Sequence, residues 1–297
     1  MRKADKPQLA HAITEHCNKQ HPSGKMSDDI PETERYVLDG GSLLHKLKWK
    51  KGDTYGEIAK AYAYFTVRHY KEATVVFDGY GAGPSIKDNT HHRRGEIRNY
   101  PVVNVTKETE FEGKKEEFLS RGTNKHHLVS LISEEQRQMG CVVIQADGDA
   151  DVDITMAAVN AASTHSTTLI GEDTDLLVLL LHHTPPDSKP LYFRSDNKTR
   201  STTKVYDINH IKHLLGSDLC TQLLFLHAFT GCDSASRVYG TGKKSAFQKL
   251  VKGDVVLKSC AEEFCLKDKT HAEIENLGTQ VMITMFGGEN ASSLAAL

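Results

Sequence analysis

The sequence lacks several features that would direct it to particular classes of protein. It has no apolar run of about 18 residues, the length of a membrane-spanning helix, and its first 17 residues, "MRKADKPQLAHAITEHC", lack the apolar core of a signal peptide. No repeat or low-complexity block is present. We therefore expect an intracellular globular protein.

The cysteines offer no zinc-binding pattern. None of the six forms a C-x-x-C pair, and we interpret them as reduced structural thiols: Cys17, Cys141, Cys220, Cys232, Cys260 and Cys265. Three histidine pairs occur, at residues 91–92, 126–127 and 182–183. Because no cysteines accompany them at zinc spacing, a zinc site at these pairs is not favoured.

What is present fits a soluble α/β protein. The chain has 297 residues, of which 38% are hydrophobic and 26% charged, enough for one large domain or two small ones. Apolar strand-like segments alternate with helix-like segments between residues 35 and 181. This alternation predicts a largely parallel sheet flanked by helices. The run "LLVLLL" fits either a strand or a helix.

Aspartates follow four of these strand-like segments. An acid comes directly after "YVL" and "TVVF", and acids come shortly after "VVIQA" and "TTLI". In open parallel sheets, ligands bind at the carboxyl ends of the strands. The acids are therefore expected to meet at one edge of the sheet. The candidate set, which includes one aspartate from the later "GCD" stretch, is Asp39, Asp78, Asp149, Asp151, Asp173, Asp175 and Asp233.

So many carboxylates in one place require neutralisation. Two like charges about 4 Å apart repel by roughly 4 kcal/mol at an effective dielectric constant near 20. Oxygen-only ligands favour Mg²⁺ or Mn²⁺ over zinc. Two such ions can activate a water molecule and stabilise the leaving oxygen of a phosphodiester. Metal-assisted phosphodiester hydrolysis is the reaction class that fits.

The local geometry leaves alternatives open. Asp173 and Asp175 share a face if their segment is extended, and Asp149 can converge with Asp151 only if it precedes the helix. Residues 149–153 can also be interpreted as acids that cap a helix. Asp147, Asp153 and Glu172 are secondary candidates for metal ligands, in reserve behind the seven aspartates.

Five stretches of the sequence, taken together and in order, resemble motifs of the flap endonuclease and 5′-nuclease branch of the PIN-like superfamily. They are "VLDGGSLLH", "VVFDG", "ADGDADVD", "GEDTDLL" and "GCDSASRVYGTGKKSAF". The resemblance implies a PIN-like α/β fold and places the seven aspartates at the family's metal positions. Family members often have Glu where this chain has Asp149 and Asp151.

The resemblance also implies a layout for the chain. Residues 1–34 would be a polar lead-in, residues 35–252 the nuclease domain, and residues 253–297 a helical or loosely ordered extension. Within the domain, about residues 87–127 would form a basic gateway excursion. About residues 207–252 would hold a helix–two-turn–helix element.

Two basic regions are candidates for nucleic-acid contact in this resemblance. In the gateway, Lys87 and either Arg93 or Arg94 would contact the scissile phosphate, although a solvated helix face is an equally simple interpretation. In the helix–two-turn–helix element, Gly240 and Gly242 would allow tight turns with exposed N–H groups, and Lys243 and Lys244 would attract phosphate. A G-x-G sequence alone is an ordinary turn.

The charge distribution of the chain bears on its expected partners. Without the seven candidate metal acids, the formal charge of −2 becomes +5 for the rest of the chain. This distribution predicts a positively charged surface path next to a negatively charged metal site. The basic run at residues 46–51 fits such a path or a solvated helix end. The resemblance favours DNA over RNA, a monomer and a nuclear location. No membrane association and no sliding-clamp motif are predicted.

Two departures and two alternatives accompany the nuclease interpretation. The start "MRKADKPQ" differs from the family's glycine-containing N-terminal motif, and residues beyond Gly253 show no clamp-binding motif. One alternative is a catalytically silent PIN-like protein that binds nucleic acid or acts as a scaffold. The other is a phosphatase with a D-x-D nucleophile at "DTD", but Leu176 and Leu177 follow where that chemistry normally has small residues.

Overall fold

The computed structural model of the protein describes residues 5–20, 32–79, 100–195, 204–233, 235, 240 and 242–288. The chain divides into two compact units. The sheet unit comprises residues 27–176 and 185–207, and the helical unit comprises residues 1–26, 177–184 and 208–297.

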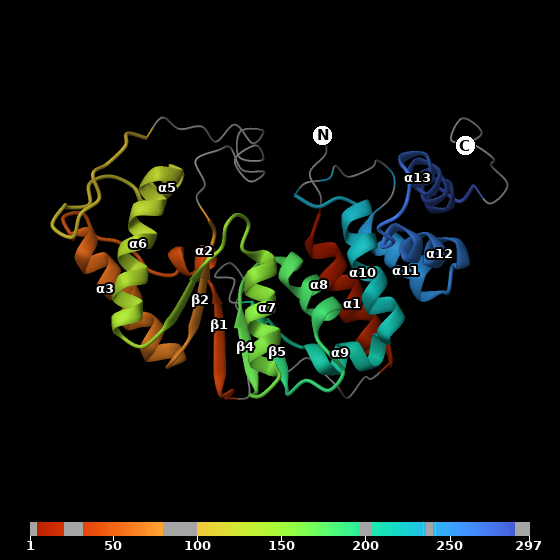
Figure 1. Ribbon diagram of the computed structural model, residues 1–297, viewed down its shortest axis with the longest axis horizontal. Helices are drawn as coiled ribbons and strands as arrows, with labels where there is room; N and C mark the ends of the chain where they lie inside the picture. Colours follow the sequence, from red (N-terminus) through yellow and green to blue (C-terminus); the bar gives the residue numbers. More distant parts are fainter. Residues whose placement is uncertain are drawn as a thin grey trace. The chain divides into compact units, whose positions relative to one another are not determined.

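The sheet unit is built on six strands in the order β3-β2-β1-β4-β5-β6 (Figure 1). All neighbouring pairs are parallel except β5 and β6, which are antiparallel. The strands are β1 (Arg35–Asp39), β2 (Thr74–Phe77), β3 (Val142–Gln145), β4 (Thr167–Ile170), β5 (Leu191–Ser195) and β6 (Lys204–Asp207). The parallel sheet predicted from the sequence is confirmed.

The strand order reverses at β1, which pairs with β2 on one side and β4 on the other. Asp39 is aligned with Val76, and Leu38 is aligned with Ile170, so the three strands end at nearly the same level. The crevice outside the carboxyl ends of strands at such a reversal is the usual ligand site of open α/β sheets. The topology therefore predicts a ligand site at this edge of the sheet.

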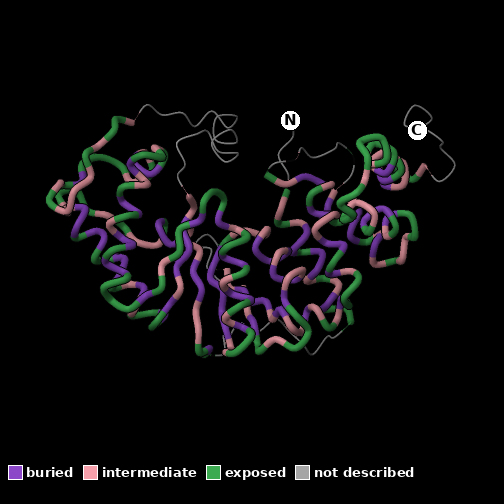
Figure 2. Tube along the Cα trace, viewed as in Figure 1, coloured by how far each residue is buried: buried purple, intermediate pink, exposed green. Residues whose placement is uncertain are grey.

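Helices cover both faces of the sheet. Helices α3 and α6 lie side by side over one face, where Val75 and Phe77 join their apolar residues in one core, and α7 packs on β1 and β4 (Figure 1). Strand β4 is buried along its whole length, and its neighbour β1 is buried over part of its length (Figure 2). The helices of this unit are α2 (Gly40–Leu44), α3 (Tyr55–Tyr70), α5 (Lys115–Leu119), α6 (Gly122–Gln138), α7 (Asp151–Ala162) and the start of α8 (Thr174–His183).

Local sequence explains why α3 begins where it does. The Thr54 hydroxyl accepts the N–H of Glu57, and the Glu57 carboxylate accepts the N–H of Thr54, which is a complete capping box. Farther along, the Tyr62 hydroxyl donates to the Leu44 carbonyl at 2.5 Å and accepts from Trp49 Nε1 at 3.0 Å. These bonds fix the chain just after α2, which leads away from the end of β1.

The helical unit contains α1 (Pro7–Gln20), the rest of α8, α9 (Ile208–Leu215), α10 (Ser217–Phe229), α11 (Lys243–Val251), α12 (Val255–Phe264) and α13 (His271–Met285). Helix α1 lies within the segment expected to be a polar lead-in. Its Leu9 and Ile13 are fully buried, and it packs on α11. Within the described part of the chain, no helix combines the length and apolar character needed to span a membrane.

Strands β5 and β6 were not predicted from the sequence, and the run "LLVLLL", for which strand and helix were both left open, belongs to helix α8. The expected excursion over residues 87–127 falls partly outside the described residues, but it includes α5 and the first turn of α6. The expected extension includes the ordered helices α12 and α13.

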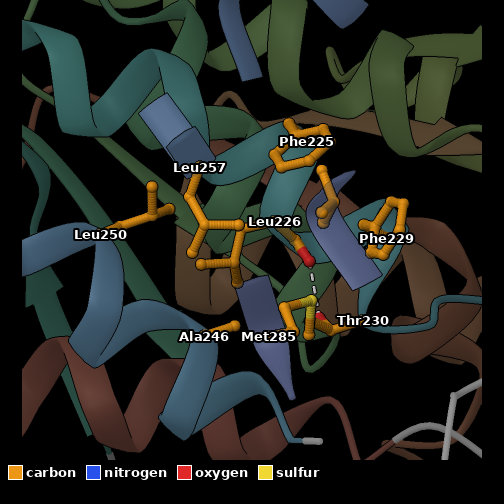
Figure 3. A pocket seen from close by; sticks show the side chains of 9 residues that line it. Phe225, Leu226, Phe229, Thr230, Ala246, Leu250, Leu257 and Met285 are labelled. Carbon is orange, nitrogen blue, oxygen red and sulfur yellow. Dashed lines mark hydrogen bonds between the residues drawn. The ribbon is translucent and has the colours of Figure 1, made fainter. Parts of the chain in front are cut away.

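A pocket in the helical unit is lined by α10, α11, α12 and α13 (Figure 3). Phe225, Phe229 and Met285 are among its apolar side chains. The polar side chain in the lining is Thr230, whose hydroxyl donates to the Leu226 carbonyl at 2.6 Å. Because no charged or metal-ligating side chain lines it, this pocket does not fit the predicted chemistry.

Candidate metal centre

Six of the seven candidate acids belong to the sheet unit and follow four neighbouring parallel strands. Asp39 is the last residue of β1, and Asp78 follows the last residue of β2. Asp149 and Asp151 lie beyond β3, and Asp173 and Asp175 lie beyond β4. The carboxyl edge of the sheet thus carries the acids that the sequence placed there.

Three of these carboxylates form a cluster. Asp151, Asp173 and Asp175 each offer an oxygen atom, and the three atoms lie within 4.8 Å of one another. All three residues are partly buried. The cluster joins the start of α7 to the start of α8, two segments that are far apart in the sequence. Its donors are all carboxylate oxygens, the ligand type that Mg²⁺ and Mn²⁺ prefer.

The turns that lead into the two helices bring these acids together. The N–H of Asp151 donates to Asp149 Oδ1 at 3.1 Å, and the N–H of Asp175 donates to Asp173 Oδ1 at 3.1 Å. Asp149 precedes α7, as its convergence with Asp151 requires. The segment from Asp173 to Asp175 is not extended, because α8 begins at Thr174. Of the geometries left open for this segment, the structure has a helix-start turn.

Asp39 combines a capping bond with a position near Asp78. Its Oδ1 accepts the N–H groups of Gly41 at 2.8 Å and Ser42 at 3.2 Å, which caps α2. A Cβ atom on Gly41 would lie 3.1 Å from Asp39 Oδ1 and 3.9 Å from Asp78 Oδ2. The two carboxylates therefore border the same glycine.

Asp78 is held by the loop that follows β3. The N–H of Ala150 donates to Asp78 Oδ1 at 3.2 Å, and the N–H of Gly79 donates to the Gly148 carbonyl at 2.8 Å. A Cβ atom on Gly79 would lie 2.2 Å from the Ala146 carbonyl oxygen, so only glycine allows this close approach. The loops after β2 and β3 are consequently tied together beside the acids.

The reserve acids show different surroundings. Asp147 and Asp153 are exposed, and Glu172 pairs with Lys46, whose Nζ lies 3.0 Å from Glu172 Oε1. The Lys46 side chain is only 10% exposed. Lys46 is therefore not part of a solvated helix end, which was one interpretation of the basic run at residues 46–51.

Basic side chains lie beside the acids on both sides of β1. Lys46 approaches from the segment after α2, and Lys125 Nζ lies 3.7 Å from Asp78 Oδ2. Partial desolvation of its ring, followed by the charges of Lys115 and Lys125, lowers the pKa of His45 at the end of α2, which favours its neutral form at pH 7. Lys125 was missed because it lies in a segment interpreted as a mobile excursion. The apolar periodicity of "HHLVSLI" was the signal for α6.

The remaining predicted site residues belong to the helical unit or fall outside the described residues. Asp233 belongs to the helical unit, where its carboxylate pairs with Lys6 Nζ at 2.9 Å. Its role as a metal ligand stays a prediction. Lys87, Arg93 and Arg94 fall outside the described residues, so the basic gateway also stays a prediction.

The expected phosphate-binding turn precedes α11. Gly240 has a φ of 87°, a conformation that favours glycine, and Gly242 is the N-cap residue of α11. Lys243 is 2% exposed, and its Nζ donates to the His227 carbonyl at 2.8 Å and to the Thr230 hydroxyl at 3.2 Å. The geometry gives Lys243 an internal contact in place of the expected surface one. Lys244 is exposed and pairs with Glu15.

Comparison with known proteins is consistent with this architecture. No protein-family model and no curated protein sequence matches the chain. Among solved structures, the T5 D15 protein co-crystallized with metal ions has a TM-score of 0.50 and 16% identity over 84% of this chain and 88% of its own. The catalytic core of Rad2 in complex with DNA substrate has a TM-score of 0.45 and 13% identity, covering 89% and 78%. The eukaryotic junction-resolving enzyme GEN-1 has a TM-score of 0.48 and 12% identity, covering 99% and 57%.

At such identities a structural likeness is evidence of a common fold. The parallel order of β1 to β4 and the position of the acidic edge agree with the resemblance noted in the sequence. The chain shares its α/β fold, a six-stranded and mostly parallel sheet flanked by helices, with the T5 D15 protein, and this is the fold that the resemblance implied.

Proposed function

We propose that the protein is a divalent-metal-dependent nuclease that hydrolyses phosphodiester bonds in DNA, with the substrate selectivity of a 5′-nuclease or flap endonuclease. The cluster of Asp151, Asp173 and Asp175 at the strand-order reversal is the observation that carries this proposal. The likeness to the T5 D15 protein, which was co-crystallized with metal ions, supports it at the level of fold.

The cluster and its neighbours fit a binding site for Mg²⁺ or Mn²⁺, and we propose two ions. Asp151, Asp173 and Asp175 would hold one ion. The candidate ligands for the second ion are Asp39, Asp78, Asp149 and Asp233. When bound, such ions supply a water of lowered pKa and neutralise the charge on a phosphodiester. The hydrogen bonds that Asp39, Asp149 and Asp173 accept from backbone N–H groups each occupy one carboxylate oxygen, which restricts the direction of the other.

Two groups of residues are proposed to contact the phosphates of a nucleic acid. Lys87 and Arg93 or Arg94 are proposed to contact the scissile phosphate. Gly240, Gly242 and Lys244 are proposed to contact the duplex backbone, with Lys243 holding their turn from inside. Such contacts attract phosphate without reading base sequence. We further propose a monomeric protein that acts in the nucleus.

A cleavage assay with defined substrates tests the proposal. We expect Mg²⁺- or Mn²⁺-dependent cleavage of at least one of 5′-flap, single-stranded and duplex substrates, and loss of cleavage in Asp173→Asn. Asp187→Asn is the matched control, because Asp187 is an exposed acid that precedes β5, at the opposite end of the strands. No cleavage of any DNA or RNA by the wild type would favour the silent binding or scaffold protein.

A further inference from the structure

Lys125 occupies a position that the sequence did not single out. It lies in the first turn of α6, and its Nζ is 3.7 Å from Oδ2 of Asp78. The side chains are 23% and 18% exposed, so water screens the pair only partly. This places an ammonium group beside a carboxylate of the candidate metal centre.

The helix itself does not explain a lysine at this position. The N-terminus of a helix carries partial positive charge, so a cation in the first turn is unfavourable. Helix α6 has no acidic residue in its first turn, and its N-cap residue, Arg121, makes no side-chain capping bond. The charge of Lys125 is thus compensated from outside the helix, by Asp78.

The backbone that carries Lys125 is firmly anchored. The buried side chain of Asn124 accepts the N–H of Val103 at 2.9 Å and donates to the Pro101 carbonyl at 2.9 Å. Leu128 and Ile132, farther along α6, are fully buried in the core shared with α3. The lysine side chain itself has a flexible four-carbon stem and three donors.

Asp78 cannot bind a divalent cation and also keep its ion pair with Lys125 unchanged. Its Oδ1 already accepts the N–H of Ala150 at 3.2 Å, so Oδ2 is the atom that Lys125 approaches. A divalent ion at that carboxylate would repel the ammonium group, which would then need another anion within reach of its stem. A phosphate drawn to the same metal centre is such an anion.

From this geometry we propose that Lys125 is a positioning residue with two states. Without metal, it is the counter-ion that offsets part of the repulsion among the carboxylates. With metal and substrate bound, its ammonium group turns from Asp78 to a phosphate oxygen of the nucleic acid. This inference rests on the proposed nuclease function and adds a cationic contact on an ordered helix.

Lys125→Met, compared with Lys107→Met, tests the proposal. Lys107 is a matched control because its Nζ pairs with Glu134 and Glu135, also on α6. Calorimetric titration of the metal-free full chain with Mn²⁺ should show Lys125→Met binding about 2- to 5-fold more tightly than wild type, the range expected for losing one partly exposed ion pair. Single-turnover cleavage of the best DNA substrate should fall roughly 10-fold or more. Lys125→Arg should recover part of that loss, and Lys107→Met should match wild type in both measurements.

The outcomes separate this inference from the proposed function. If wild type binds Mn²⁺ and cleaves while Lys125→Met has unchanged Mn²⁺ affinity and unchanged cleavage, Lys125 is only a structural ion pair and the inference is overturned. If wild type neither binds Mn²⁺ nor cleaves, the proposed function fails instead. Should Lys125→Met not fold, Lys125→Gln, which keeps a polar side chain, replaces it with the same expected and contradicting results.

Discussion

The backbone N–H of Ala150 donates to Oδ1 of Asp78 at 3.2 Å, across 72 positions of sequence. The bond joins the residue that follows β2 to the residue that precedes α7, and Asp151 is the first residue of that helix. A shift of either loop therefore moves a candidate metal ligand. The acidic edge behaves as one structural piece rather than as a set of separate loop acids.

Gly79→Ala should disrupt this piece. The added Cβ would lie 2.2 Å from the Ala146 carbonyl oxygen, a backbone atom that cannot rotate away. We expect a loss of about 1–3 kcal/mol in the free energy of unfolding, typical of overpacking, measured by urea denaturation. Gly148→Ala, in the adjoining loop, places its Cβ in open space and should change stability by less than about 0.5 kcal/mol. Equal effects of the two substitutions would show that the close approach of the loops is not a constraint.

The neighbouring lysines of α11 should respond differently to substitution. Lys243→Met removes a buried ammonium that donates to His227 and Thr230, so we expect a stability loss of about 1–3 kcal/mol. Lys244→Glu alters an exposed side chain and should leave the free energy of unfolding nearly unchanged. It should instead weaken duplex binding and flatten its salt dependence. The prediction for Lys244 is abandoned if the slope of binding against salt concentration matches wild type.

Much of the fold was accessible from the sequence because its signals were local and repeated. Each of the strands β1 to β4 is a short run rich in apolar residues with a carboxylate at or after its end, and parallel connection brings those ends to one edge. Asp39 and Asp78 illustrate this, since each needs only the residues beside it to be placed. The resemblance then added the order of the motifs.

The rest depended on contacts between distant residues. Helix α1 is polar on average, yet Leu9 and Ile13 suffice to bury one face against partners far along the chain. Lys243 looks like an exposed phosphate ligand in the sequence, and only the end of α10 reveals its internal role. The ion pair of Lys125 with Asp78 is likewise invisible without the packing of α6 on α3.

Helix α1 should therefore contribute to stability. Ile13→Ala is expected to cost about 2–4 kcal/mol, because a fully buried side chain would leave a cavity. Asn18→Ala, at an exposed position of the same helix, should be nearly neutral. Thermal unfolding of the two variants checks this, and an Ile13→Ala protein as stable as wild type would mean that α1 is a detachable segment.

Stability at acidic pH should depend on Glu34, which bridges to the start of β4. Its Oε2 accepts the N–H of Ser166 at 2.9 Å and the Ser166 hydroxyl at 3.1 Å, and these bonds lower the pKa of Glu34. Because the folded pKa lies below the unfolded one, the contribution is complete above the unfolded value, about 4.3, and disappears as pH falls through the folded value. Glu34→Gln should therefore differ from wild type at pH 7 but converge with it once the pH has fallen below the folded pKa of Glu34, as measured by urea unfolding. A stability difference that is independent of pH would contradict this role.

The most direct test of the account is anomalous diffraction from crystals of the protein grown with Mn²⁺. We predict an anomalous peak among Asp151, Asp173 and Asp175, with their carboxylate oxygens as ligands of the ion. Saturating Mn²⁺ with no peak between these side chains, or with manganese only at other surfaces, would contradict the metal centre on which the proposed chemistry depends.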